Sequence, residues 1–219
     1  MTEEMKTRVE TTLNNLKRNR MDAYYVDTKE QACDLVKTLI QKGDVLSCGG
    51  SVTLKETGVY DLITSADYKF LDRSACKTPD EIEEIYRKTY CAAAFFTSAN
   101  AVTENGELYN VDGNSNRVAA ILYGPKSVVF ICGVNKIVKN LDEAVRRVKT
   151  KAAPPNTVRL GIDTPCSKTG ECISLRRENP EMCEGCHGDG RICCNYVVCA
   201  QQRHVGRMKV ILIGENYGY

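Results

Sequence analysis

Tryptophan is absent from this 219-residue sequence, and aromatic residues together make up only 7% of it. The formal net charge is only +2, and lysine and arginine do not gather into a long basic stretch. A protein that binds nucleic acid usually needs a basic face for phosphates and aromatic rings that stack on bases. We therefore expect no nucleic-acid partner.

Long hydrophobic runs are also missing. The longest, around Cys91–Phe96 and Ser127–Val134, are far shorter than the roughly 20 residues that a helix needs to cross a bilayer. The first twenty residues mix both charges and lack the apolar centre of a secretion signal. We therefore expect a cytoplasmic protein without a membrane span. Structural disulfides are rare in that reducing compartment.

The hydrophobic residues that are present, 42% of the chain, are enough for one well-filled core. Their spacing predicts strands at Met21–Val26, Val45–Cys48, Tyr68–Leu71, Ala92–Thr97, Ser127–Cys132 and Arg207–Gly214. It predicts helices over residues 1–20, 28–41, from Thr78 onward, 114–123 and 140–151, the last ended by Ala-Ala-Pro-Pro. Strands that alternate with helices indicate a mainly parallel, open α/β sheet wound on both faces, in a single domain over residues 1–219.

Cysteine is the residue that this sequence has in excess. Six of its twelve cysteines lie between Thr164 and Cys194. The segment 164–199 shows no helical or strand period, so we expect a long cysteine-rich insertion before the last strand. Cys183 and Cys186 form a C-x2-C pair, which lets two thiolates face one ion from a tight turn. The further candidate ligands are Cys166, Cys172 and Cys193.

Three interpretations of these thiols remain open from the residues alone. Disulfides fit poorly with a reducing compartment, and free loop thiols are the simplest alternative. Four thiolates can also close a tetrahedral zinc site or hold an iron–sulfur cluster. Acidic side chains balance the basic ones in this segment, so a bound metal would be needed to keep several thiolates ionised. The spacing does not decide between zinc and iron, and His187 is a further candidate zinc ligand, although a solvated loop histidine explains it as well.

Polar loops that follow predicted strands suggest a ligand pocket, because open α/β sheets bind ligands at the carboxyl ends of their strands. The loop Gly49–Ser51, with Gly50 between them, opens a helix and offers its amides to a phosphate or carboxylate. Asn135 and Lys136 follow another strand and would add a cation at the same rim.

A second loop, from Asn110 to Arg117, crowds short polar residues around the start of a helix. We expect Asn110, Asn114 and Arg117 to contact a small anionic metabolite. The alternative is a simple helix cap, in which Asp112 or Asn114 satisfies backbone donors.

Several long strings place the chain beside a known family. From Phe95 to Val138 it reads FFTSANAVTENGELYNVDGNSNRVAAILYGPKSVVFICGVNKIV, which closely resembles the lactate-utilisation (LUD-domain) proteins. TPCSKTGEC, RIC and the closing VILIGENYGY resemble the same family, so the likeness covers most of the chain after Asp44. It implies a Rossmann-like fold of the sugar-phosphate isomerase and CoA transferase type. It also implies a link to the oxidation of lactate to pyruvate, with iron–sulfur or flavin partner proteins.

The resemblance further implies a ligand set and a cofactor. The pattern TPC…TG-x-C-x2-C-x6-RIC of many family members maps here onto Cys166, Cys172, Cys186 and Cys193. Leu175 stands where the pattern has its third cysteine, and extra residues precede Cys186, so Cys183 is an additional candidate. The expected cofactor is an iron–sulfur cluster of the 4Fe–4S type, with zinc as the alternative.

Related folds also suggest catalytic residues. Asp112 resembles the general acid–base position of the sugar-phosphate isomerases. Glu104, in its T-E-N-G turn, is similar to the nucleophilic glutamate of CoA transferases, although most turn glutamates are merely solvated.

Three hypotheses follow for the function. The first is an iron–sulfur-binding accessory or electron-transfer component of lactate oxidation with a small-anion pocket. The second is an isomerase or acyl-transfer enzyme that uses Asp112 or Glu104 on a phosphorylated or CoA-linked metabolite and carries structural zinc. The third is a regulator without catalytic activity that senses metal or redox state.

Overall fold

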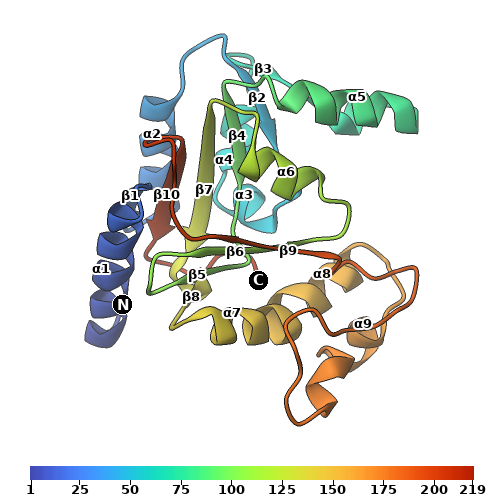
Figure 1. Cartoon of the computed structure of the whole chain (residues 1–219). Coiled ribbons are helices and arrows are strands. Elements are labelled where there is room, and N and C mark those ends of the chain that lie inside the picture. Colours follow the sequence, from blue (N-terminus) through green and yellow to red (C-terminus); the bar gives the residue numbers. More distant parts are fainter.

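A six-stranded sheet forms the centre of the computed structural model, which describes residues 1–219 (Figure 1). All its neighbouring strands are parallel, in the order β1-β10-β7-β4-β2-β3. The strands are β1 (Asp22–Val26), β2 (Val45–Cys48), β3 (Lys69–Phe70), β4 (Ala94–Thr97), β7 (Ser127–Gly133) and β10 (Met208–Ile213). The predicted mainly parallel, open α/β sheet is therefore confirmed.

Helices cover both faces of this sheet, which explains why its central strands are apolar throughout. Along β7, Val128 and Phe130 belong to one buried cluster, whereas Val129 and Ile131 belong to the other. The first cluster includes residues of α1 (Glu3–Arg18) and α6 (Asn116–Leu122). The second includes residues of α2 (Lys29–Leu39), α3 (Val52–Glu56) and α4 (Val59–Ile63). Helix α5 (Pro79–Thr89) starts at the expected place with a complete capping box.

A second sheet of four short strands lies against the carboxyl end of the main sheet (Figure 1). Its order is β8-β5-β6-β9, with β8 (Ile137–Val138), β5 (Ala101–Thr103), β6 (Leu108–Asp112) and β9 (Asn195–Cys199). Strands β5 and β6 are antiparallel and joined by the predicted turn over residues 104–107. Gly106 in this turn has φ +81°, and a Cβ there would lie 2.5 Å from the backbone of Asn15 in α1. The turn therefore packs directly against α1, and a residue larger than glycine at position 106 would clash with that helix.

Two sequence expectations need correction. We expected the helix after Asn140 to be ended by Ala-Ala-Pro-Pro. The α-helix α7 (Leu141–Arg147) ends earlier, but the chain stays helical through a π-helical stretch (Val148–Ala152) and into α8 (Ala153–Arg159). Both prolines lie in the first turn of α8, where a missing N–H costs no hydrogen bond. The cysteine-rich segment also contains regular structure: α9 (Pro165–Thr169), a 3₁₀ turn (Ile173–Arg176) and strand β9. Two shorter 3₁₀ turns occupy Arg73–Ala75 and Val134–Lys136.

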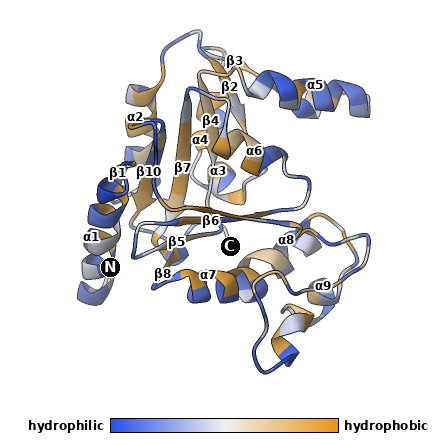
Figure 2. Ribbon diagram, in the orientation of Figure 1, coloured by the Kyte–Doolittle hydropathy of each residue, from blue (hydrophilic) through white to orange (hydrophobic).

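The hydropathy of the ribbon follows the layers. Figure 2 shows hydrophobic residues along the central strands and mixed or hydrophilic colours along α1 and α5. No helix combines the length and the apolar character required to cross a membrane.

Candidate functional site

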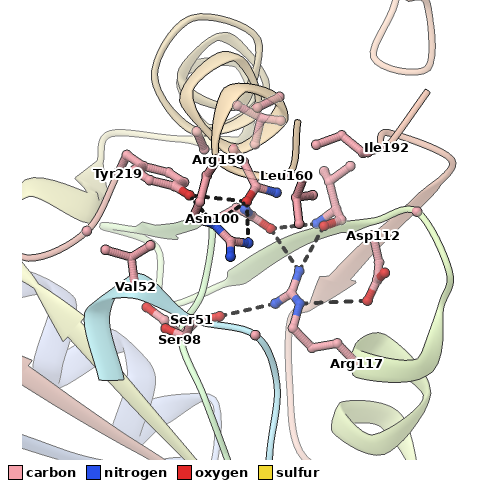
Figure 3. A pocket seen from close by; sticks show the side chains of 18 of the residues that line it. Ser51, Val52, Ser98, Asn100, Asp112, Arg117, Arg159, Leu160, Ile192 and Tyr219 are labelled. Atoms are coloured by element: carbon pink, nitrogen blue, oxygen red, sulfur yellow. Dashed lines mark hydrogen bonds and ion pairs between the residues drawn. The ribbon is translucent and has the colours of Figure 1, made fainter. Parts of the chain in front are cut away.

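A polar pocket of about 360 Å³ opens at the carboxyl ends of the parallel strands. The segments after β2, β4 and β7 contribute Ser51, Ser98 and Lys136, and the end of β6 contributes Asp112. Helix α8 forms the far side with Arg159, beside Tyr219 (Figure 3). The pocket therefore lies where the strand order predicts a ligand site.

Most of the predicted pocket residues are brought together here. The lining includes Gly50, Ser51, Asp112, Asn114, Arg117 and Lys136. Gly49 lies beneath the pocket, where a Cβ would come within 3.0 Å of the Arg117 side chain, so this glycine leaves room for the arginine. Asn110 and Asn135 do not line the pocket, but each forms a hydrogen bond with a residue that does: Asn110 with Arg117, and Asn135 with Gly218.

Arg117 is held by the protein itself. Its two Nη nitrogens donate to four acceptors at 2.8–3.1 Å: the carbonyls of Ser98 and Val111 and the side chains of Asn100 and Asn110. Figure 3 shows Arg117 beside Ser98, Asn100 and Asp112. Its Nε lies 3.7 Å from an Asp112 oxygen, and burial lowers the pKa of the guanidinium. Because four of its N–H groups are already bonded, Arg117 ties β4, β6 and α6 together and gives the pocket a fixed wall.

Asp112 acts as a cap for α6. Its Oδ1 accepts from the backbone N–H groups of Asn114 and Ser115, and its Oδ2 accepts from that of Val118. These bonds satisfy donors at the helix start, as the alternative interpretation of this loop proposed. Asp112 thus supports α6 from the edge of the pocket, which it also lines.

Lys136 is the buried cation of the pocket. Only 3% of the residue is exposed, and its Nζ donates to Ser98 Oγ at 2.8 Å and to Thr53 Oγ1 at 2.9 Å. Both partners are neutral hydroxyls, and no carboxylate lies within ion-pair distance. Burial lowers the pKa of Lys136 to about 8. A buried ammonium without a counter-ion is costly, and an anion in the pocket would relieve that cost.

Glu104 lies away from the pocket, in the β5–β6 turn. It pairs with Arg8 of α1, with 2.5 Å between Arg8 Nε and Glu104 Oε1, and Arg8 also donates to the Ile137 carbonyl. The structure therefore does not bring Glu104 to Asp112, and its contacts attach α1 to the second sheet.

Some pocket residues escaped the sequence analysis. Arg159 donates to the side chains of Tyr219 and Asn156, and its remaining Nη faces no protein acceptor. Arg73 also lines the pocket, with its guanidinium beside Gly50. Arg159 comes from α8 and Arg73 from a 3₁₀ turn, and neither belongs to a motif in the sequence. Tyr219 ends the string VILIGENYGY, which indicated the family but not a place in the pocket.

A second, narrow cavity of about 30 Å³ lies behind the polar pocket. Four of the five predicted metal ligands line it: Cys166, Cys172, Cys186 and Cys193. The fifth, Cys183, is exposed and does not line it. All twelve cysteines of the chain are free. We call this space the thiol cavity.

The thiols of this cavity affect one another. Burial, together with the nearby thiols of Cys172, Cys166 and Cys186, raises the pKa of Cys193 to about 12. Burial also raises the pKa of Cys186, again with Cys166 and Cys172 as neighbours. Cys186 and Cys193 are therefore protonated at neutral pH unless a cation displaces their protons.

Arg191 organises the loop that carries the thiols. Its guanidinium donates to the carbonyls of Cys183, Cys186 and Cys193 at 2.6–2.9 Å and to the Tyr196 hydroxyl at 3.2 Å. Lys149, which is almost fully buried, donates to the Glu181 carbonyl at the start of the same loop. Both cations line the thiol cavity and would offset the negative charge of a thiolate-bound group.

The donor set suits a soft metal or an iron–sulfur cluster, since four thiols line the cavity and its one carboxylate, Glu184, is paired with Arg177. No group of three or more His, Cys, Asp or Glu side chains is arranged to hold a single metal ion. The loop with Cys183 and Cys186 supplies one of the four thiols that line the cavity, Cys186. That loop carries no regular secondary structure between the 3₁₀ turn and β9.

The two cavities share a wall. Val148, Ala153, Ile192 and Cys193 line both of them. A ligand in the polar pocket would therefore lie next to Cys193, and a group bound to Cys193 would lie next to that ligand.

Taken together, the fold and the two cavities define an α/β protein with a cationic pocket beside a thiol cluster. The profile of the LUD domain family matches residues 9–213, so the chain belongs to the LUD domain family, which is related to lactate utilisation. A search of curated proteins found no match to the sequence.

One solved structure supports the fold. A DUF162 family protein from Deinococcus radiodurans is similar over 96% of this chain and 97% of its own, with a TM-score of 0.50 and 14% identity. The eIF2B beta subunit from Chaetomium thermophilum matches 51% of this chain and 43% of its own, with a TM-score of 0.36 and 16% identity. At these identities the likeness to the first structure concerns the fold alone.

Proposed function

We propose that this protein binds a small anionic metabolite in the polar pocket and an iron–sulfur cluster in the thiol cavity. It would serve as an accessory or electron-transfer component of lactate oxidation. The observation that carries the proposal is the shared wall, because Cys193 lines both cavities. A ligand and a cluster on the two sides of this residue would be close enough for electron transfer.

The residues of the pocket have defined tasks in this proposal. Lys136 supplies the positive charge that pairs with a carboxylate, and Ser98 and Thr53 hold its ammonium in place. Arg159 adds a second, more exposed cation at the entrance. Arg117 keeps the wall rigid, so the anion meets a preformed site.

The thiol cavity supports the second half of the proposal. Cys166, Cys172, Cys186 and Cys193 would hold the cluster, with Cys183 as a substitute ligand from the same loop. Such a cluster supplies one-electron transfer when bound. The oxidation of lactate to pyruvate releases two electrons and two protons. A flavin partner protein would accept the electron pair and pass the electrons one at a time to the cluster, which would hand each to an iron–sulfur partner protein, while the protons go to water.

The alternative of an isomerase or acyl-transfer enzyme with structural zinc has less support. Asp112 is committed to the cap of α6, and Glu104 is paired with Arg8 at a different place. Neither carboxylate is free to act on a ligand beside Lys136.

Purification under anaerobic conditions tests the proposal directly. We expect brown protein that contains iron and acid-labile sulfide. The Cys193→Ser variant should lose most of the iron, whereas Cys194→Ser should keep it, because the exposed Cys194 lines neither cavity. Colourless wild-type protein with stoichiometric zinc would overturn the iron–sulfur half.

Calorimetric titration tests the anion half separately. Lactate, pyruvate and inorganic phosphate serve as probes, and at least one carboxylate should bind to the wild type. If none of the three probes bound, the proposed anion pocket would be wrong, and the proposal of an iron–sulfur cluster would still be judged by the iron content.

A further inference from the structure

The thiol cavity contains one polar group that the fold leaves without a partner. Tyr109 is completely buried, and its hydroxyl has no hydrogen-bond partner. The same residue lines the thiol cavity together with the four cysteines. Tyr109 belongs to neither the anion pocket nor the thiol ligand set, so the proposed function gives it no role.

The strand period explains how the ring comes to this place. Leu108 of β6 packs into the buried cluster with α1 and the main sheet, so the next residue points to the opposite face. There Tyr109 packs with Ala144 and Val148 of the α7 side, and Cys193 and Tyr196 border the same cluster. Its position is thus fixed by pairing in the sheet, and its hydroxyl is held at the cavity.

A buried hydroxyl without a partner is rare, because burial removes its bonds to water and gives nothing in return. The nearby phenol of Tyr196 differs, since its oxygen accepts a bond from Arg191. The remaining groups that surround the cavity near Tyr109 include thiols, which become strong acceptors once they are ionised by a metal.

We infer that the Tyr109 hydroxyl donates a hydrogen bond to a sulfur of the inorganic group in the thiol cavity and raises its reduction potential. This inference rests on the proposed iron–sulfur cluster. Reduction adds negative charge to the sulfurs, so a donor stabilises the reduced cluster more than the oxidised one. Tyr109 is a positioning residue that tunes the group and does not ligate it.

The test compares the anaerobically purified wild type with Tyr109→Phe, which removes only the hydroxyl. Tyr60→Phe is the matched control, because Tyr60 lies on α4 across the main sheet, with its ring against Phe70. The midpoint potential is measured by redox titration monitored by electron paramagnetic resonance, together with the iron content.

We expect Tyr109→Phe to keep its iron and to have a more negative potential. The ratio of reduced to oxidised cluster at a fixed potential should fall about tenfold, which corresponds to 59 mV for a one-electron couple. The control should match the wild type. An unchanged potential in a fully loaded Tyr109→Phe protein would overturn the inference and leave the proposed function intact, whereas a wild type without iron would overturn both.

A second measurement covers the case in which Tyr109→Phe does not load. Resonance Raman spectra of the wild type in H₂O and D₂O should differ in the iron–sulfur stretching region, because a deuterated hydroxyl alters the sulfur that it contacts. Identical spectra would show that the Tyr109 hydroxyl donates no hydrogen bond to a sulfur of the group, and the inference would be wrong.

Discussion

The polar pocket and the thiol cavity lie side by side, yet they differ in how far the protein completes them. In the pocket, four N–H groups of Arg117 have protein acceptors, and both Asp112 oxygens accept backbone donors. In the thiol cavity, four free cysteines and the unpaired Tyr109 hydroxyl surround a narrow space. In the pocket, Lys136 has no counter-ion and one Nη of Arg159 has no acceptor, whereas in the cavity four thiols and a phenol hydroxyl all face the same space.

This difference has a physical origin. The pocket is built at the ends of parallel strands whose backbone positions are fixed by the sheet, so short loops suffice to fix its side chains. The thiol cavity is closed by an irregular loop held by Arg191 and Lys149 through backbone carbonyls. A metal-bound group commonly supplies order that such a loop cannot provide alone.

The largest effect is expected on metal content, in the thiol cavity, which the protein leaves less complete than the pocket. Cys186→Ser removes a thiol that lines only the thiol cavity, so iron content should fall to a small fraction of the wild-type value. Anion binding in the neighbouring pocket should persist, because Cys186 does not line it. Metal analysis and calorimetry on the same preparation give both quantities. Loss of anion binding with retained iron would reverse the comparison.

Removal of the buried cation should have the next largest effect, on the other cavity. Lys136→Met should weaken carboxylate binding about 10- to 100-fold, the contribution of a charged hydrogen bond. The unliganded variant should be at least as stable as the wild type, because it no longer buries an unpaired charge. Calorimetry and urea unfolding provide the measurements. Lys151→Met, at an exposed lysine outside the pocket, is the control and should behave as the wild type.

The pKa of Lys136, about 8 in the folded protein against an ordinary 10.5, adds a pH dependence. Anion affinity should fall as the pH rises through 8, because the ammonium loses its proton. Between pH 8 and 10.5 the unfolded chain holds this proton and the folded protein does not. The free energy of unfolding of the unliganded protein should therefore rise with pH across that window. Lys136→Met should flatten both trends, and equal slopes in the two proteins would contradict the assignment.

A smaller effect, on stability, is expected at Asp112, where the protein itself supplies the hydrogen-bond partners. Asp112→Asn keeps the shape of the side chain but weakens the cap of α6, so the free energy of unfolding should fall by roughly 1–2 kcal/mol. Carboxylate affinity should not fall, since the change removes a negative charge from an anion pocket. Urea unfolding and calorimetry measure the two effects. A stable variant that no longer binds the anion would restore Asp112 as a functional group.

The sequence located the main sheet and much of the pocket because both have local signals. Val45–Cys48 is predicted and observed with the same ends, since an apolar run bounded by glycine is typical of a strand buried on both faces. Lys136 was found because polar residues follow such a strand, and Asp112 because short polar residues crowd the start of a helix. The cysteines were found because of their number and spacing.

The rest depended on contacts between distant parts of the chain. Strand β9 pairs with β6, with Cys199 opposite Leu108, and no local period in the cysteine-rich segment indicates this pairing. Arg159 reaches the pocket because α8 begins at the two prolines, which the sequence had suggested as the end of a helix. Tyr109 could be placed at the thiols only once the register of β6 was known, because its neighbours in sequence give no hint of a cavity.

The smallest expected effect concerns Glu104, which the sequence suggested as a nucleophile and the structure pairs with Arg8. Glu104→Gln should lower the free energy of unfolding by about 0.5 kcal/mol, because the two side chains are about a quarter exposed and their pairing is partly screened. Glu10→Gln, at an exposed position of α1, is the matched control and should change stability less. Urea unfolding measures the change in the free energy of unfolding for both variants. Iron content and anion affinity should be unaffected in both variants, because Glu104 lines neither cavity. If Glu104→Gln instead weakened anion binding while leaving stability unchanged, α1 and the β5–β6 turn would have to be counted as part of the site, and the division of the protein into two adjoining cavities would be incomplete.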